Sequence, residues 1–174
     1  GCKDEIPFNL IVHPTPTPDA GIDNTTCGLS YPLSASQTSG TTANWQTISD
    51  ATINEVNNPN SSVSVTDYGT YSFVWEETSS FGCYNNSTVN ILFVPSPTSS
   101  SIENITICPG EEVFLDASSE NYTSTSWTTS GTGYFLDYQS NPTTYTPSDL
   151  DISNNGASLT FTAVNSPCPN STAN

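Results

Sequence analysis

The stretch Gly69-Thr70-Tyr71-Ser72-Phe73-Val74-Trp75 decides the fold class. Aromatic side chains alternate with smaller ones along it, which is typical of a half-buried β-strand because successive side chains point to opposite faces. The preceding Asp67 and Tyr68 form a turn signal with Gly69. We therefore predict a turn that leads into a strand with Tyr71, Phe73 and Trp75 on one face.

Similar runs recur along the chain, and no long segment has the 3.6-residue period of an amphipathic helix. Turn-forming residues separate the runs, and many short strands with regular turns are typical of a β-sandwich. We expect further strands at Phe8–Val12, Tyr31–Ala35, Ala43–Ile48, Ser62–Thr66, Val89–Phe93, Ile102–Ile107, Glu112–Ala117, Thr125–Thr129, Thr143–Thr146 and Leu159–Ala163.

A repeat with a period of 81 residues sets the scale of the modules. Residues 1–28 align with residues 82–109 without a gap, so that Cys2 falls on Cys83. Within the modules a shift of 82 places Trp45 on Trp127. A fixed long period indicates tandem modules.

The proline-rich segments mark the module boundaries, because they favour stiff extended conformations. We expect a terminal strand of a preceding module with its linker at residues 1–18, module one at 19–97 and module two at 98–174. The predicted fold is therefore all-β, with tandem sandwich modules joined by short proline-rich linkers.

The composition is polar and acidic: one Lys or Arg stands against 17 Asp and Glu, and the net charge is −16. Disorder is the alternative for so polar a chain, but the apolar residues are periodic and the 7 Phe, 8 Tyr and 3 Trp need burial. Without a basic patch, nucleic acid is not an expected partner. No stretch is apolar enough to span a bilayer, so membrane insertion is not expected.

The five cysteines indicate an oxidising, extracellular setting, with free thiols or metal ligands as the alternative. Each module has one cysteine near its start and one near its end. We therefore predict pairs within modules, Cys27 with Cys83 and Cys108 with Cys168. Cys2 takes the Cys83 position, so we expect its partner in a preceding module or subunit.

The segment Asp67–Tyr71 reads D-x-G-x-Y, the pattern that enters strand F of immunoglobulin folds. The resemblance implies that Tyr71 forms a tyrosine corner and that Trp45 and Trp127 pack in the cores. Module two lacks that tyrosine. The chain also resembles the immunoglobulin-like and PKD-like tandem repeats of large Bacteroidota cell-surface proteins, including gliding-motility adhesins. The sequence segments that carry this resemblance are Ser126–Gly133, Asn141–Ser148 and Leu159–Ala163. That resemblance implies export and a location at the cell surface.

Residues suited to catalysis are few. His13 is the single histidine, it lies beside a proline, and we expect a structural role. Glu76-Glu77 and Glu111-Glu112 point to opposite strand faces and are interpreted as solvated edges. We therefore expect no enzyme activity and no cofactor. Calcium is a weak candidate at Asp149 and Asp151, or near Asp19 and Asp23, because Ca²⁺ prefers oxygen ligands.

Surface modification is a further hypothesis, since Ser, Thr and Asn are abundant. Each N-x-S/T match is weak by itself, and the source would need the glycosylation machinery. The candidate sites are Asn24, Asn60, Asn85, Asn86, Asn104, Asn121 and Asn170.

Module two stops before its last strand, since aligning Cys168 on Cys83 leaves Asn90–Val94 without a counterpart. Two interpretations stay open. The chain continues in both directions as one array, or separate subunits join head to tail. In the second, a donor strand with Ile6, Phe8, Leu10 and Val12 completes the open sandwich of the next subunit.

Both interpretations predict a structural segment of an extracellular fibre, filament or adhesin stalk, whose partners are neighbouring copies or modules of the same protein. A ligand- or glycan-binding adhesin module is the alternative, and exposed aromatics at Tyr134, Phe135 and Tyr138 would favour it.

Overall fold

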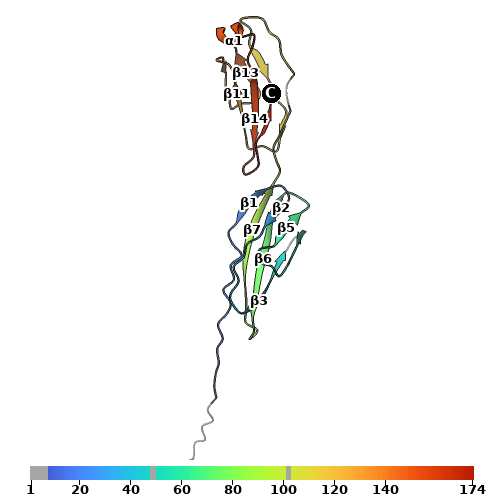
Figure 1. The fold of residues 1–174 in the computed structure, drawn as a ribbon, viewed down its shortest axis with the longest axis vertical. Helices are drawn as coiled ribbons and strands as arrows, with labels where there is room; N and C mark the ends of the chain where they lie inside the picture. The colour runs from blue at the N-terminus through green and yellow to red at the C-terminus, as the bar shows by residue number, and fades with distance from the viewer. Residues whose placement is uncertain (1–7, 48–49, 101–102) are drawn as a thin grey trace, which may run out of the picture. The chain divides into compact units, whose positions relative to one another are not determined.

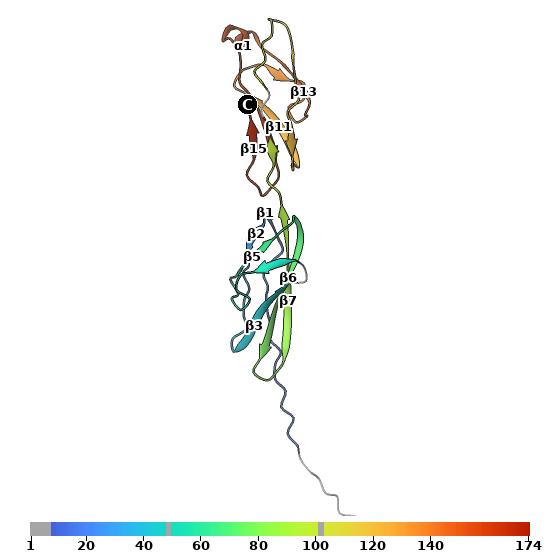
Figure 2. The same cartoon turned by 90° about the vertical axis from the view of Figure 1, so that its right-hand side faces the viewer.

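The structure is a computed structural model that describes residues 8–47, 50–100 and 103–174. Nearly all of its regular structure is β-strand (Figures 1 and 2). The chain divides into two compact units. Unit 1 comprises Gly1–Asn24, Ser30–Thr66 and Thr70–Ile91, and unit 2 comprises Thr25–Leu29, Asp67–Gly69 and Leu92–Asn174.

Module one forms two β-sheets, with antiparallel strand pairs in both. A four-stranded sheet has the order β1-β7-β6-β3, and a three-stranded sheet has the order β2-β5-β4. The long strands β6 and β7 are joined by a tight hairpin in which the Ser79 N–H donates to the Cys83 carbonyl at 2.8 Å. The strands are β1 (Asn24–Cys27), β2 (Ser30–Pro32), β3 (Thr41–Thr47), β4 (Ala51–Ile53), β5 (Ser62–Val65), β6 (Gly69–Ser79) and β7 (Tyr84–Val94).

The alternation in β6 buries one face, as the sequence predicts: Phe73 and Trp75 are fully buried and Tyr71 is half-buried. Trp45 on β3 lies opposite Trp75 in the strand register, with ring centroids 5.0 Å apart. The Trp45 indole N–H donates to the carbonyl of Asn58 at 3.1 Å. Other side chains buried in module one are Leu33, Val63, Val65, Val89, Ile91 and Phe93.

Glu77 corrects the interpretation of Glu76-Glu77 as a solvated edge, because its side chain is fully buried. It lies on the same face of β6 as Trp75, whose indole N–H donates to Oε1 at 3.1 Å. The backbone N–H of Thr38 donates to both carboxylate oxygens, at 3.0 and 3.1 Å, and the Thr41 hydroxyl donates at 3.3 Å. These donors compensate for the lost hydration of the carboxylate.

Module two has three smaller sheets, with the orders β11-β14-β15, β12-β13-β9 and β10-β8. Strands β11 and β14 pair along their whole length, with Trp127 opposite Phe161. The elements are β8 (Thr98–Ser99), β9 (Val113–Leu115), β10 (Ser119–Glu120), β11 (Ser124–Thr129), β12 (Tyr134–Phe135), β13 (Thr143–Thr146), α1 (Asp149–Ser153), β14 (Leu159–Val164) and β15 (Ser171–Ala173).

The core of module two is an aromatic cluster in which the rings of Trp127 and Phe161 lie 5.0 Å apart between centroids. Trp127 takes the core position expected from Trp45, but its buried indole N–H has no acceptor among the described residues. The cluster consists of Val113, Leu115, Ala117, Trp127, Tyr145, Phe161 and Ala163.

Two predicted strands differ from the structure. Residues 8–12 are extended coil, because no neighbouring strand pairs with them. Residues 103–107 are also coil, and Ile102 lies outside the described residues. The sequence pattern detects the propensity of both segments, whereas a strand also requires a partner.

Candidate functional site

Residues 8–12 run away from the strands of unit 1 as an extended segment (Figures 1 and 2). Their apolar side chains are exposed. Phe8, Leu10 and Val12 are 86%, 79% and 80% exposed. Ile6, the fourth predicted donor residue, lies outside the described residues. So large a run of exposed apolar side chains typically marks an interaction site. We name residues 8–12 the projecting segment.

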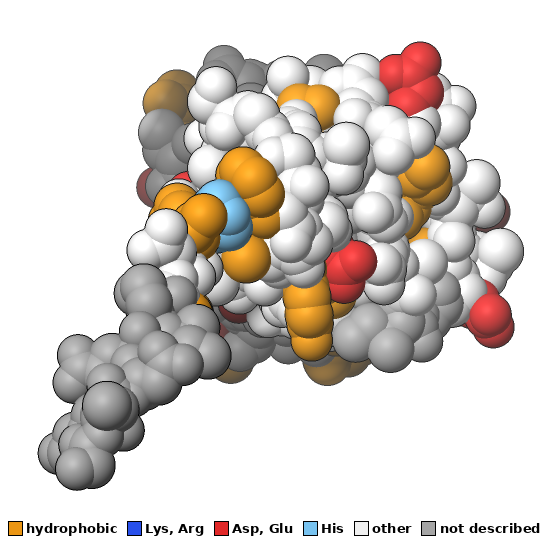
Figure 3. Space-filling view, turned by 90° about the horizontal axis from the view of Figure 1, so that it is seen from below, with side chains coloured by type: hydrophobic (Ala, Val, Ile, Leu, Met, Phe, Trp, Pro, Cys, Tyr) orange, Lys and Arg blue, Asp and Glu red, His pale blue; other side chains and the backbone are white. Residues whose placement is uncertain are grey.

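The projecting segment is followed by His13, which packs against the β6–β7 hairpin. The imidazole stacks on Phe81 with ring centroids 3.4 Å apart, and Figure 3 shows hydrophobic side chains around the single histidine. The His13 carbonyl lies 4.0 Å from Sγ of Cys83. The predicted structural role of His13 agrees with this packing.

The second half of β7 shows where such a segment belongs in a complete sandwich. The 81-residue shift aligns residues 8–12 with residues 89–93. Val89, Ile91 and Phe93 are 2%, 0% and 1% exposed, because they share the inward face of β7, which lies between β1 and β6 in the sheet. Hydrogen bonds fix the β1 side: the Gly28 N–H donates to the Val94 carbonyl at 3.0 Å.

Module two contains a pocket of about 700 Å³ in the corresponding region. Core side chains line it, including Trp127, Tyr145 and Phe161. Its other walls are the coil around Ile105–Pro109, the segment Asn155–Leu159 and the end of β15. These walls correspond to the strands that flank β7 in module one.

Strand β15 covers only part of the length of β14 beside the pocket. β7 has 11 residues, whereas β15 has 3 and pairs with β14 only as far as Ala173, opposite Phe161. Leu159 and Thr160 therefore have no partner in β15. The counterpart of β1 at residues 105–108 likewise has no strand beside it and stays coil, with Ile105 half-exposed.

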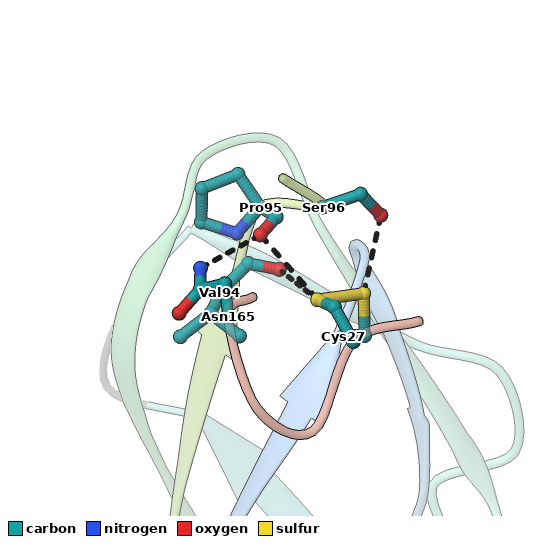
Figure 4. The surroundings of a disulfide bond; sticks show 6 residues. Cys27, Val94, Pro95, Ser96 and Asn165 are labelled. Atoms are coloured by element: carbon teal, nitrogen blue, oxygen red, sulfur yellow. Dashed lines mark hydrogen bonds between the residues drawn. A yellow bond between two sulfur atoms is a disulfide. The ribbon is translucent and has the colours of Figure 1, made fainter. Parts of the chain in front are cut away.

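Among the described residues one disulfide is present, between Cys27 and Cys168, with a Cα–Cα distance of 4.9 Å (Figure 4). It lies against the residues that follow β7. Sγ of Cys27 is 3.2 Å from the Ser96 hydroxyl, and Sγ of Cys168 is 3.8 Å from the Val94 carbonyl. The disulfide thus lies where the chain leaves β7 and enters the second proline linker.

The predicted pairing within modules is wrong. Cys27 lies beside the end of β7, whereas Cys83 precedes its first residue. At roughly 3.3 Å per residue, β7 separates them by about 35 Å, and a disulfide requires Cα atoms within about 7 Å. Cys108 lines the pocket near Leu159, at the start of β14, whereas Cys168 follows the other end of that strand.

Cys83 and Cys108 consequently have no disulfide partner among the described residues. Cys2 lies outside those residues. Cys108 is exposed and Cys83 is partly exposed, so both thiols are accessible to a partner.

Asp151, a weak calcium candidate, is buried and satisfied by protein donors. Its carboxylate accepts hydrogen bonds from the Thr132 and Gly133 backbone N–H groups at 2.8 and 2.9 Å, and from the Tyr145 hydroxyl at 2.7 Å. It also forms a capping box with Ser148 at the start of α1. The backbone N–H of Ser148, then that of Thr132 and the Tyr145 hydroxyl, hold the pKa of Asp151 well below its ordinary value of 3.8.

The described residues contain no group of three or more potential metal-ligating side chains, and Asp149 does not join Asp151 in one. They also contain no helix of the length and apolar character needed to cross a membrane.

The aromatic side chains that would favour ligand binding are only partly exposed, and Tyr134 and Phe135 lie on β12. Tyr134 and Tyr138 are 64% and 56% exposed. Phe135 instead packs on the core, 4.9 Å from Tyr145 between ring centroids. All seven asparagines of the N-x-S/T sites have exposed side chains, a requirement for glycosylation.

No family model matches the chain, and no curated protein matches it. Solved structures do. A three-domain immunoglobulin fragment of titin aligns over 92% of this chain and 65% of its own, with 12% identity and a TM-score of 0.51. The IG1 and IG2 domains of DIP-gamma align over 91% and 94%, with 12% identity and a TM-score of 0.43. Extracellular cadherin domains 3–6 of protocadherin gamma B2 align over 90% and 45%, with 8% identity and a TM-score of 0.41. The chain has an all-β, immunoglobulin-like fold.

Proposed function

We propose that this protein is a non-catalytic structural segment of an extracellular fibre, filament or adhesin stalk that assembles head to tail by strand complementation. The projecting segment of one copy enters the pocket of module two in the next copy. There it extends the line of β15 and pairs with residues 105–108 and 155–160, as β7 pairs with its neighbours in module one.

The observation that carries this proposal is the match between an exposed apolar segment and an open core in one chain. Phe8, Leu10 and Val12 occupy the same repeat positions as Val89, Ile91 and Phe93, which are buried in module one. The alternation also fits, since Asn9 aligns with Asn90. Burying three such side chains contributes about 1.5–3 kcal/mol each.

An extracellular location is supported by the Cys27–Cys168 disulfide, because disulfides persist in oxidising compartments. The sequence segments that resemble the tandem repeats of Bacteroidota cell-surface proteins support a fibre at the cell surface. Self-association would also cover the sheet edges, which have almost no lysine to protect them.

Electron microscopy of the native material, with helical averaging, tests the proposal. The expected result is density for residues 8–12 of a neighbouring copy in the pocket. Continuous density from Asn174 into the pocket would overturn strand donation and establish one long repeat polypeptide. Isolated particles that carry a bound glycan or another ligand in the pocket would favour a binding module instead.

A further inference from the structure

We propose that Cys108 of one copy forms a disulfide with Cys83 of the next copy, so that the fibre is linked covalently end to end. This inference rests on the proposed head-to-tail assembly. It assigns a role to the two described cysteines that the single chain leaves unpaired.

The repeat register leads to this pair. Cys27 and Cys108 are equivalent at a shift of 81, and Cys83 and Cys168 are the equivalent cysteines near the module ends. The observed bond joins the start cysteine of one repeat to the end cysteine of the following repeat. Applied once more, the same rule assigns Cys108 to the end cysteine of the module that follows module two. In a head-to-tail fibre that cysteine is Cys83 of the next copy.

The surroundings of Cys83 match those of Cys168. Sγ of Cys168 lies 3.8 Å from the Val94 carbonyl, and Sγ of Cys83 lies 4.0 Å from the His13 carbonyl. Val94 and His13 are equivalent at the 81-residue shift, and each is followed by a proline. Each end cysteine therefore already lies beside the residue that follows the buried residues 89–93 or the projecting segment.

The surroundings of Cys108 match those of Cys27. Cys27 ends β1, beside the final residue of β7. Cys108 ends the coil that lines the pocket, the counterpart of β1. When residues 8–12 of a neighbour occupy the pocket as residues 89–93 occupy module one, His13 takes the place of Val94. Cys83 of that neighbour then meets Cys108 as Cys168 meets Cys27.

The chemistry is thiol–disulfide exchange with an exogenous disulfide as oxidant. A Cys108 or Cys83 thiolate attacks that disulfide and forms a mixed disulfide with half of the oxidant. The second protein thiolate then attacks the mixed disulfide and displaces that half as a thiolate. The two protein thiols give up two electrons and two protons, the S–S bond between the copies forms, and the oxidant leaves as two thiols.

Single-cysteine variants in a Cys2→Ser background test the pairing, because Cys2 is then no competing thiol. On non-reducing denaturing gels the Cys2→Ser protein should give a ladder of covalent oligomers. Cys83→Ser and Cys108→Ser should each give monomer alone. Their equimolar mixture should give dimer and nothing larger, because only one complementary thiol pair remains per two chains.

Peptide mapping identifies the bond. Lys3 is the single Lys or Arg, so trypsin is unsuitable and chymotrypsin is used under non-reducing conditions. The expected species joins a Cys83 peptide to a Cys108 peptide and disappears after reduction. Symmetric Cys83–Cys83 or Cys108–Cys108 species, a link to a foreign sequence, or dimer from either single variant would overturn the inference.

Electron microscopy of the Cys83→Ser variant separates the two proposals. Fibres that form without the covalent ladder leave strand complementation standing and agree with a disulfide that locks it. Fibres from the Cys2→Ser protein that lack the Cys83–Cys108 peptide under oxidising conditions overturn the disulfide alone. Absence of fibres in every variant and in the wild type overturns the proposed function.

Discussion

Leu10→Ala measures how much the projecting segment contributes to association. Leu10 is 79% exposed in the single chain, and its repeat counterpart Ile91 is 0% exposed. Truncation to alanine removes three carbons, which at about 0.8 kcal/mol per buried CH₂ weakens each end-to-end contact by about 2–3 kcal/mol. Because 1.4 kcal/mol is a factor of ten, association should weaken about 30- to 140-fold.

Ile11→Ala is the matched control. Ile11 is similarly exposed in the single chain, at 73%, but its counterpart Leu92 stays 38% exposed on the outer face of β7. The control should therefore change association by less than about fivefold, as expected of a partly exposed position. Neither substitution should change the stability of the single chain, because both side chains lie in solvent there.

Sedimentation velocity over a concentration series provides the assay, under reducing conditions so that only non-covalent contacts count. The half-point of polymerisation should move to higher concentration for Leu10→Ala and stay near the wild-type value for Ile11→Ala. Equal weakening by both variants would refute an alternating, strand-like insertion. If the Leu10→Ala variant polymerised at the same concentration as the wild-type protein, insertion of this segment would be refuted altogether.

Three further predictions concern the single chain. Phe161→Ala should lower the unfolding free energy of module two by about 3–5 kcal/mol in urea titration, whereas the exposed Leu136→Ala should change it by less than about 0.5 kcal/mol. Since the folded pKa of Asp151 is depressed, its contribution to stability is present above about pH 4 and is lost as the pH falls through the folded value. Asp151→Asn should accordingly flatten the acid side of a melting-temperature profile, and an unchanged slope would contradict that role. The double variant Cys27→Ser/Cys168→Ser opens a closure with a sequence separation of 141, worth about 5 kcal/mol in the chain-entropy model, and calorimetry should record a lower melting temperature.

Local alternation was sufficient to predict several of the strands and the buried tryptophans. Strand β13 spans the predicted Thr143–Thr146, and β14 extends the predicted Leu159–Ala163 by one residue. Trp45 and Trp127 are buried as the repeat indicates. These features depend on neighbouring residues in the chain and on side-chain period, which a single sequence contains.

The disulfide and the buried carboxylates depend on contacts that alternation does not encode. Cys27 and Cys168 meet because both lie next to Val94, which the residue count of each module does not reveal. Glu77 continues the inward face of Phe73 and Trp75, so a strict reading of the period would have placed it inside. Asp151 forms a capping box with Ser148 at the start of a helix, and such a capping pattern is not part of strand alternation.

The Cys27–Cys168 bond also determines how the single chain responds when it is pulled from its two ends. Tension applied between residues before Cys27 and residues after Cys168 crosses directly from Cys27 to Cys168 and bypasses the intervening chain. At a contour length of about 3.4 Å per residue, a separation of 141 residues corresponds to roughly 480 Å of chain, which cannot extend while the disulfide is intact. The β-sheets inside the loop therefore carry no load while the disulfide is intact, and its reduction makes the enclosed residues extensible.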